Sequence, residues 1–142
     1  MDSASTNGIM SFNHKPEHCG HVSGFVNTQE EQRVHIEVRQ ANGPQIDGIT
    51  MEGQGHRSTL REVMSNSPGW SFGPFPFETR VYIKITHKRD GAWVASHVVG
   101  PLTVDKRPER NYPMEFRSQT VISEDLDNSG HEDCTVTVLE YK

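Results

Sequence analysis

The sequence predicts an all-β protein, a single-domain antiparallel β-sandwich of about seven to nine strands. Short stretches of the chain alternate apolar and polar residues, as half-buried strands do, and no helical period extends beyond about two turns. Hydrophobic residues make up only 32% of the 142 residues, and the mean hydropathy is −0.69. A core of that size fits a thin sandwich with many loops better than an α/β enzyme, and the length fits one domain.

Three strands are predicted in the first part of the chain. Residues 1–13 are small and polar, and we expect them to form a flexible N-terminal segment before a single sandwich domain at 14–142. Strands are expected at residues 22–26 and 33–39, because the second stretch alternates regularly between apolar and polar side chains. An Asn-Gly-Pro turn signal then leads into a third strand at residues 46–52.

The centre of the chain holds one ambiguous stretch, one loop and one hairpin. Apolar residues in 56–64 are spaced by three and four, which fits a short helix as well as a strand. Residues 67–77 combine proline and glycine with aromatic side chains, so we expect an irregular loop. Residues 79–87 and 92–99 alternate on either side of an Arg-Asp-Gly turn, which predicts a β-hairpin.

The last part of the chain is expected to contain two strands around an acidic loop. Residues 101–104 continue or leave the hairpin, and residues 105–113 contain two prolines and mixed charges, as a surface loop does. Strands are expected at residues 114–122 and 134–141, the latter rich in β-branched side chains. The acidic residues lie between these two strands.

The acidic stretch between the last two strands has the oxygen donors that calcium prefers. Asp125, Asp127 and Ser129 recur at every second position, and a glycine that permits a sharp turn follows them. The stretch begins like an EF-hand loop, but the twelfth position is Val136, where that motif needs a bidentate glutamate. The alternative is a solvated hairpin connection. The predicted calcium ligands are Glu124, Asp125, Asp127, Ser129, Glu132 and Asp133.

The C-terminal part resembles a known family in this stretch. Ser-Glu-Asp, six residues, Glu-Asp and then an alternating strand that ends the chain are similar to the calcium-mediated lectins of the two-calcium bacterial type. The resemblance implies a small β-sandwich in which sugar hydroxyls ligate the metal ions directly. The positions that fall on or beside that family's acidic loop are Glu124, Asp125, Asn128, Gly130, Glu132 and Asp133.

This sequence departs from the family at three of these positions and at its last residue. Gly130 and Asn128 stand where the family has aspartates, and Glu132 stands where it has an asparagine. The family ends in a glycine whose carboxylate helps to bind, whereas this chain ends in Lys142.

Aromatic residues of 67–77 are a candidate ligand-binding surface. Trp70, Phe72 and Phe75 sit among prolines and glycines, so a constrained loop would display them, and such rings stack on sugars or apolar ligands. The alternative is that they close one end of a small core, since buried aromatic rings carry much of its apolar area.

A histidine-rich stretch is a candidate for a second metal site. His14, His18 and His21 lie close to Cys19 and are three of the eight histidines. Imidazole and thiolate are the donors that zinc and copper prefer, but the spacing matches no zinc motif that we know. Cys19 and Cys134 are far apart in sequence, and the alternatives are one long-range disulfide or two thiols.

The charge and hydropathy of the sequence limit which kinds of partner the protein is expected to have. The net charge is −5, with no clustered basic residues that would favour nucleic acid. The chain has no apolar run long enough for a transmembrane segment and no secretory signal, so we expect a soluble protein that is cytoplasmic or released without a signal peptide.

Together these features favour a calcium-dependent carbohydrate-binding protein, lectin-like, with the sugar near the C-terminal acidic loop. Its partner would be a carbohydrate or glycoconjugate, and a homo-oligomer remains open. One alternative is a β-sandwich that binds a protein partner or a membrane and uses calcium structurally. Another is a small enzyme of specialised metabolism with His35 and His56 in a pocket, although no catalytic motif is present, so enzyme activity is left open and we assign no catalytic residue.

Overall fold

The computed structural model describes residues 3–106, 115–124 and 133–142. Within these ranges the chain forms eleven strands and no helix, so it has no helix that could cross a membrane. The strands are β1 (Ser3–Ser5), β2 (Ile9–His14), β3 (Cys19–Gln40), β4 (Gln45–Thr59), β5 (Arg61–Glu62), β6 (Gly69–Phe72), β7 (Thr79–Arg89), β8 (Ala92–Ala95), β9 (His97–Lys106), β10 (Phe116–Glu124) and β11 (Cys134–Tyr141).

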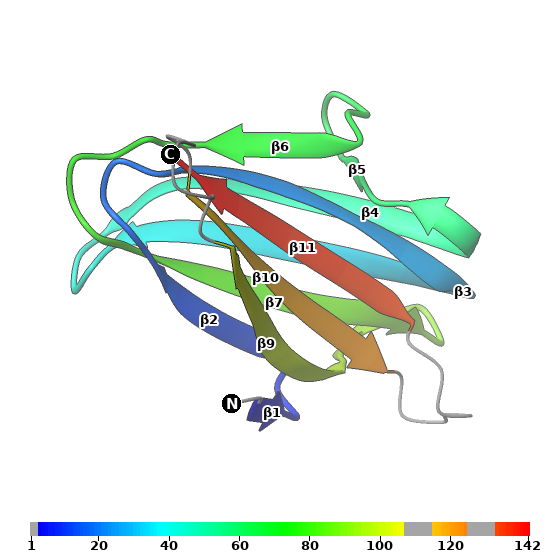
Figure 1. Cartoon of the computed structure of the whole chain (residues 1–142). Helices are drawn as coiled ribbons and strands as arrows, with labels where there is room; N and C mark the ends of the chain where they lie inside the picture. The colour runs from blue at the N-terminus through cyan, green and yellow to red at the C-terminus, as the bar shows by residue number, and fades with distance from the viewer. Residues whose placement is uncertain (1–2, 107–114, 125–132) are drawn as a thin grey trace.

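Strand β3 belongs to both layers of the fold. Its first part, up to Val26, pairs with β11 on one side and with β6 and the end of β4 on the other. Its second part, from Gln32, pairs with β4 and β7. The register with β4 shifts twice between these parts, and there the chain passes from one layer to the other. Figure 1 shows the dark-blue start of β3 beside β11 and its cyan continuation beside β7.

Two antiparallel layers therefore make a sandwich. The first layer has the order β1-β9-β10-β11-β3, with β6 on the far side of β3. The second layer contains β2 and β8 along one edge of β7, followed by the second part of β3, β4 and the short β5. The predicted fold class, a single-domain β-sandwich, is confirmed, with more strands than expected among the described residues.

The core lies between the layers because inward side chains alternate with outward ones along each strand. The first layer contributes Val121, Val136 and Val138, which are completely buried. The second layer contributes Ile36 and Ile83 among others, with no more than 1% of their surface exposed. The period of two that the sequence shows in residues 33–39 and 79–87 is thus the alternation between core and solvent.

Within the N-terminal segment 1–13, for which we expect flexibility, the described residues include β1 and most of β2. Strand β1 pairs with β9, and β2 pairs with β7 over six residues. Met10 and Phe12 of β2 are each only 6% exposed. These two side chains are separated by a single polar residue, and their burial becomes evident only once β7 is beside them.

The middle of the chain also differs in part. Residues 56–64 contain the end of β4 and all of β5, so the strand alternative holds and the helix does not form. The stretch 67–77 is not wholly irregular, because β6 forms within it and pairs with β3. The predicted hairpin is confirmed as β7 and β8, and both Asp90 and Gly91 in its turn have positive φ, as a type I′ turn requires.

A first prediction concerns the core between the layers. Replacing Ile36 with alanine should lower the free energy of unfolding by about 2–5 kcal/mol, because the change leaves a cavity that the packed sheets cannot close. Ile46, which is 37% exposed, provides the matched control, and Ile46→Ala should change stability by less than about 1 kcal/mol. Urea unfolding of both variants measures the difference. Equal effects would contradict the assignment of Ile36 to the core.

Candidate functional site

The predicted calcium loop begins and ends on adjacent strands. Glu124 is the last residue of β10, and Asp133 immediately precedes β11. The backbone N–H of Asp133 donates to the carbonyl of Ser123 at 2.9 Å, which holds the two ends of the loop together. Asp125, Asp127, Ser129 and Glu132 lie outside the described residues, so their role as ligands stays a prediction.

Asn27 lies beside the end of this loop and was missed by sequence reasoning. Its backbone N–H donates to the carbonyl of Asp133 at 2.9 Å, at the point where β3 leaves the first layer. Its side-chain Oδ1 accepts a hydrogen bond from the backbone N–H of Arg57 at 3.2 Å, which fixes the amide. Nothing in the local sequence marks this asparagine, because its position depends on pairing between segments more than one hundred residues apart.

Ser123 places a buried hydroxyl at the base of the loop. Its side chain is fully buried, and within the described residues its Oγ has no hydrogen-bond partner. A buried hydroxyl without a partner is uncommon, because its desolvation costs about 1–3 kcal/mol. This oxygen faces the core, whereas the side chain of the next residue, Glu124, points to the other face of the sheet.

The oxygen atoms at this end fit a hard cation better than a transition metal. Carboxylate, amide, hydroxyl and carbonyl oxygens are the ligands of calcium, and neither His nor Cys is among the donors named here. The donor chemistry is thus compatible with the predicted calcium ion. Glu124 and Asp133 would hold such an ion together with the predicted ligands of residues 125–132.

The predicted aromatic ligand-binding residues are not gathered at the acidic loop. Phe72 is only 2% exposed and belongs to the core, so its ring has no free face for a ligand. Phe75 accepts a backbone hydrogen bond from Glu17, near the turn between β2 and β3 and at the end of the sandwich away from Asp133. Trp70 pairs with Val22 and lines a different groove, with Arg33 and Met64 among its neighbours. The alternative of core packing therefore holds for Phe72, while ligand roles for Trp70 and Phe75 stay predictions.

The residues of the histidine-rich stretch make hydrogen bonds to oxygen atoms. His14 Nε2 contacts the carbonyl oxygen of His18 at 2.8 Å, and His18 Nδ1 contacts the carbonyl oxygen of Pro16 at 2.9 Å. His21 Nδ1 contacts Ser71 Oγ at 2.9 Å. Among the described residues no group of three or more His, Cys, Asp or Glu side chains could hold a metal ion. Hydrogen bonds to oxygen occupy these ring nitrogens, and a second metal site at His14, His18 and His21 stays a prediction.

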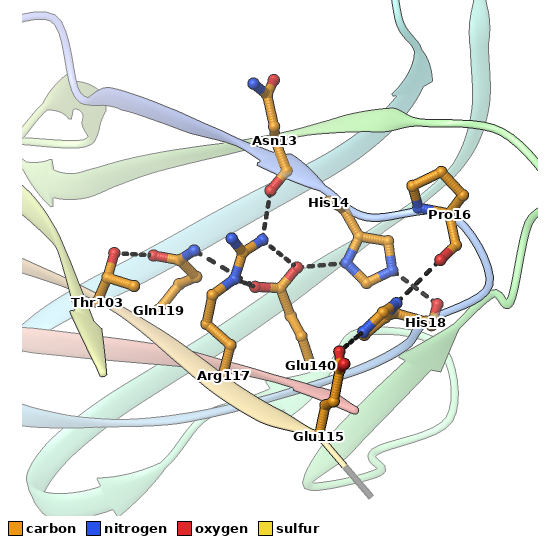
Figure 2. A network of polar contacts seen from close by, with 9 residues as sticks. All are labelled: Asn13, His14, Pro16, His18, Thr103, Glu115, Arg117, Gln119 and Glu140. Atoms are coloured by element: carbon orange, nitrogen blue, oxygen red, sulfur yellow. Dashed lines mark hydrogen bonds and ion pairs between the residues drawn. The ribbon is translucent and has the colours of Figure 1, made fainter. Parts of the chain in front are cut away.

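His14 instead belongs to a buried polar network that joins the two layers (Figure 2). Its Nδ1 lies against a carboxylate oxygen of Glu140, and each side chain is only 1% exposed. Arg117 Nε donates to the other Glu140 oxygen at 2.8 Å, and Arg117 also donates to the carbonyl of Asn13 at 2.8 Å. Gln119 Nε2 donates to Glu140 at 3.3 Å. Strand β2 of one layer is thereby bonded to β10 and β11 of the other.

The charges of this network are arranged around Glu140. Burial raises the pKa of the Glu140 carboxyl, but the hydrogen bonds from His14 and Arg117 and their positive charges lower it more, so the net shift is downward. Both ring nitrogens of His14 face oxygen acceptors, and a neutral imidazole has only one N–H. The ring of His14 thus bridges the Glu140 carboxylate and the carbonyl oxygen of His18. With both groups buried, the network serves to tie the layers together.

The other chemically notable residues lie apart from both clusters. Cys19 and Cys134 are free thiols, the first partly and the second fully buried, so the reading of two thiols holds. His35 contacts Thr50 Oγ1 at 2.7 Å on the exposed face of β3. His56 is exposed near the end of β4, so the two histidines proposed for an enzyme are not shown to share a pocket.

Comparison with solved structures identifies the fold. The chain matches the C-terminal domain of the lectin BC2L-C from Burkholderia cenocepacia with a TM-score of 0.56 and 16% identity, over 91% of this chain and 92% of that chain. It matches the lectin CV2L of Chromobacterium violaceum, in complex with α-methyl-fucoside, with a TM-score of 0.50 and 14% identity, over 95% and 96%. At such identities the likeness shows the fold alone. No protein-family model and no curated protein sequence matches the chain.

A second prediction concerns Glu140. Replacing it with glutamine keeps the shape but leaves His14 and Arg117 without their carboxylate, so stability at pH 7 should fall by about 3–5 kcal/mol. The pKa of Glu140 is lower in the folded than in the unfolded chain, so its contribution is present above the ordinary value of 4.5 and is lost as the pH falls through the folded-state value. The stability difference between wild type and Glu140→Gln should therefore shrink in acid.

Urea unfolding of both proteins at a series of pH values measures this difference, because all other carboxyl groups are common to the two. A difference that stays constant from neutral to strongly acidic pH would contradict the downward pKa shift.

Proposed function

We propose that this protein binds carbohydrate in a calcium-dependent manner at the loop between β10 and β11. The observation that carries the proposal is the set of oxygen donors at the base of this loop, where backbone hydrogen bonds hold Ser123, Asp133 and Asn27 together. Five carboxylates between Glu124 and Asp133 would repel one another without a cation. The fold likeness adds support, because both solved structures named above are lectins and one holds a fucoside.

The strands would give the site its rigidity. Glu124 and Asp133 lie at the ends of adjacent paired strands, so their backbone positions are fixed before any ion binds. Asn27 adds a third segment from β3, and its bond with Arg57 orients the amide. Bound calcium would supply positive charge and open coordination positions for sugar hydroxyl oxygens.

We also propose that the protein forms a homodimer through the outer face of the first layer. The same outward register reaches Lys106 and Glu124 at the strand ends. Between these ends, twelve outward positions of β3, β11, β10 and β9 include no Asp, Glu, Lys or Arg: His21, Ser23, Phe25, Thr135, Thr137, Leu139, Ser118, Thr120, Ile122, Val99, Leu102 and Val104. Phe25, Val99, Leu102, Val104 and Leu139 are 39–50% exposed, which is unusual for apolar side chains that lie on one face.

A second copy of the chain is the partner that this face fits best. The outer face of the second layer carries arginine, lysine and glutamate at the equivalent positions, as a solvated face does. Two uncharged faces can meet across a twofold axis without like-charge repulsion.

A third prediction tests the calcium site. Calcium should raise the thermal unfolding temperature by several degrees relative to the protein in chelator, because an ion present at 100 times its Kd stabilises the folded state by about 2.7 kcal/mol. Asp125→Ala and Asp133→Ala should reduce this rise, whereas Asp105→Ala, an exposed acidic residue of β9, should not. Binding to immobilised neutral glycans should require calcium.

Equal calcium responses in all three variants would overturn the site assignment. Glycan binding that persists in chelator would overturn calcium dependence.

A fourth prediction tests the dimer. Wild type should have the mass of two chains by light scattering, and Leu102→Glu should have the mass of one, because the new carboxylates would be buried at the interface without a partner. Ile46→Glu, on another exposed apolar residue outside this face, should leave the dimer intact. A monomeric wild type at high concentration would contradict the proposal.

A further inference from the structure

A groove on the outer face of the second layer concentrates positive charge. It has a volume of about 580 Å³ and lies over β2, β3 and β7 and the turn between β3 and β4. Three permanent cations, Arg39, Arg80 and Lys84, line it with one carboxylate, Glu37, so the local charge is 3 − 1 = +2. The whole chain has a net charge of −5. The groove is therefore opposite in sign to the rest of the molecule.

The strand register forces like charges together in this groove. Arg39 lies directly opposite Arg80 in the β3–β7 pair, and His35 lies opposite Lys84. Directly opposed cations destabilise a sheet by several tenths of a kcal/mol unless an anion lies between them. Glu37 neutralises only Arg39, from which its carboxylate accepts hydrogen bonds at 2.9 and 3.0 Å.

Arg80 and Lys84 have no carboxylate partner among the described residues. The Arg80 guanidinium donates to two neutral acceptors, Asn13 Oδ1 at 2.7 Å and Ser11 Oγ at 2.9 Å. These bonds hold the guanidinium in place without neutralising it. The exposed Lys84 ammonium makes no hydrogen bond or ion pair within the described ranges. Two uncompensated cations thus lie on the same face of β7, one on each side of Tyr82.

Tyr82 forms the floor between the cations. The guanidinium carbons of Arg39 and Arg80 lie 5.8 and 6.0 Å from the centre of its ring. The ring is partly exposed and offers an apolar face with a polar tip, the combination on which a sugar ring stacks. Gln40 and Asn42 at one end of the groove add amide groups that can bind hydroxyl groups. The volume is that of a small-ligand site.

We propose that this groove is a second, calcium-independent site for an acidic saccharide, with its carboxylate or sulfate held between Arg80 and Lys84 and its ring on Tyr82. The anion would relieve the repulsion across β3 and β7, and the planar Arg80 guanidinium can bind it through two parallel hydrogen bonds. The saccharide class rests on the proposed carbohydrate-binding function, whereas the anion requirement rests on the groove alone.

Calorimetric titration in chelator tests this proposal, with methyl β-D-glucuronide and methyl β-D-glucoside as a matched pair that differs only in the carboxylate. Glucose 6-sulfate shows whether a sulfate serves as well. The glucuronide should bind and the glucoside should not, and added salt should weaken binding because the charges are exposed. Equal binding of the glucuronide and the glucoside, or no binding of either acidic sugar at millimolar concentration, would overturn the proposal.

The variants locate the site. Arg80→Gln and Lys84→Gln should each lower glucuronide affinity by about tenfold or more, whereas Lys88→Gln, on the same strand outside the groove, should not. Thermal unfolding confirms that each variant is folded. Unchanged affinity in folded Arg80→Gln would contradict the assignment. Because chelator disables only the acidic loop, loss of neutral glycan binding with retention of the glucuronide would separate the two sites.

Discussion

The structure depends on one strand whose backbone is hydrogen-bonded in both layers. Strand β3 spans 22 residues and pairs with β11 and β6 in its first part, with β7 in its second, and with β4 along both. A slip of one residue in this strand would move every core side chain of β3 to the solvent face. The register of β3 therefore positions the core, the buried network at one end and the loop base at the other.

Where β3 passes between the layers, its regular pairing with β4 is interrupted, and its backbone hydrogen-bonds to a segment outside the strands. Asn27 lies in this passage, and its bond with Asp133 joins the crossing to the acidic loop. At the other end, the layers are joined by polar rather than apolar side chains. Glu140, His14 and Arg117 are hydrogen-bonded there, so removing Glu140 would take the carboxylate from both of its charged partners. Side-chain hydrogen bonds around Glu140 thus join the strands at one end of the sandwich. At the other end, backbone hydrogen bonds of Asp133 join β3 and β10.

The local sequence pattern was sufficient to predict those strands whose own residues alternate between apolar and polar. The alternation in 79–87, the Asp-Gly turn and the strand at 134–141 were all predicted, and the structure has them as β7, its turn and β11. Strand β2 was missed because the burial of Met10 and Phe12 depends on β7, and β6 was missed because its four residues lie among prolines and glycines.

Long-range contacts account for most of what the sequence did not reveal about the sites. The donor types of His14 and His18 suggested a metal, but the partner of His14 is 126 residues away, and this separation is invisible to spacing arguments. In the sequence, the cationic residues of β3 and β7 look like the solvent-facing residues of any half-buried strand. Only the pairing of the two strands shows that Arg39 lies directly opposite Arg80. The acidic residues of 124–133 were noticeable because they are close in sequence, whereas Asn27 lies about one hundred residues before them.

The most direct test of the account is a nuclear magnetic resonance titration that follows the backbone amides of Asn27 and Asp133, first with calcium and then with methyl α-fucoside. If the end of the sandwich is a calcium-dependent sugar site, both amides should shift with calcium and shift again with the fucoside only when calcium is present. The amide of Tyr82, on the outer face of the other layer, should stay unchanged throughout. Asn27 and Asp133 amides that respond to neither addition would contradict the central claim.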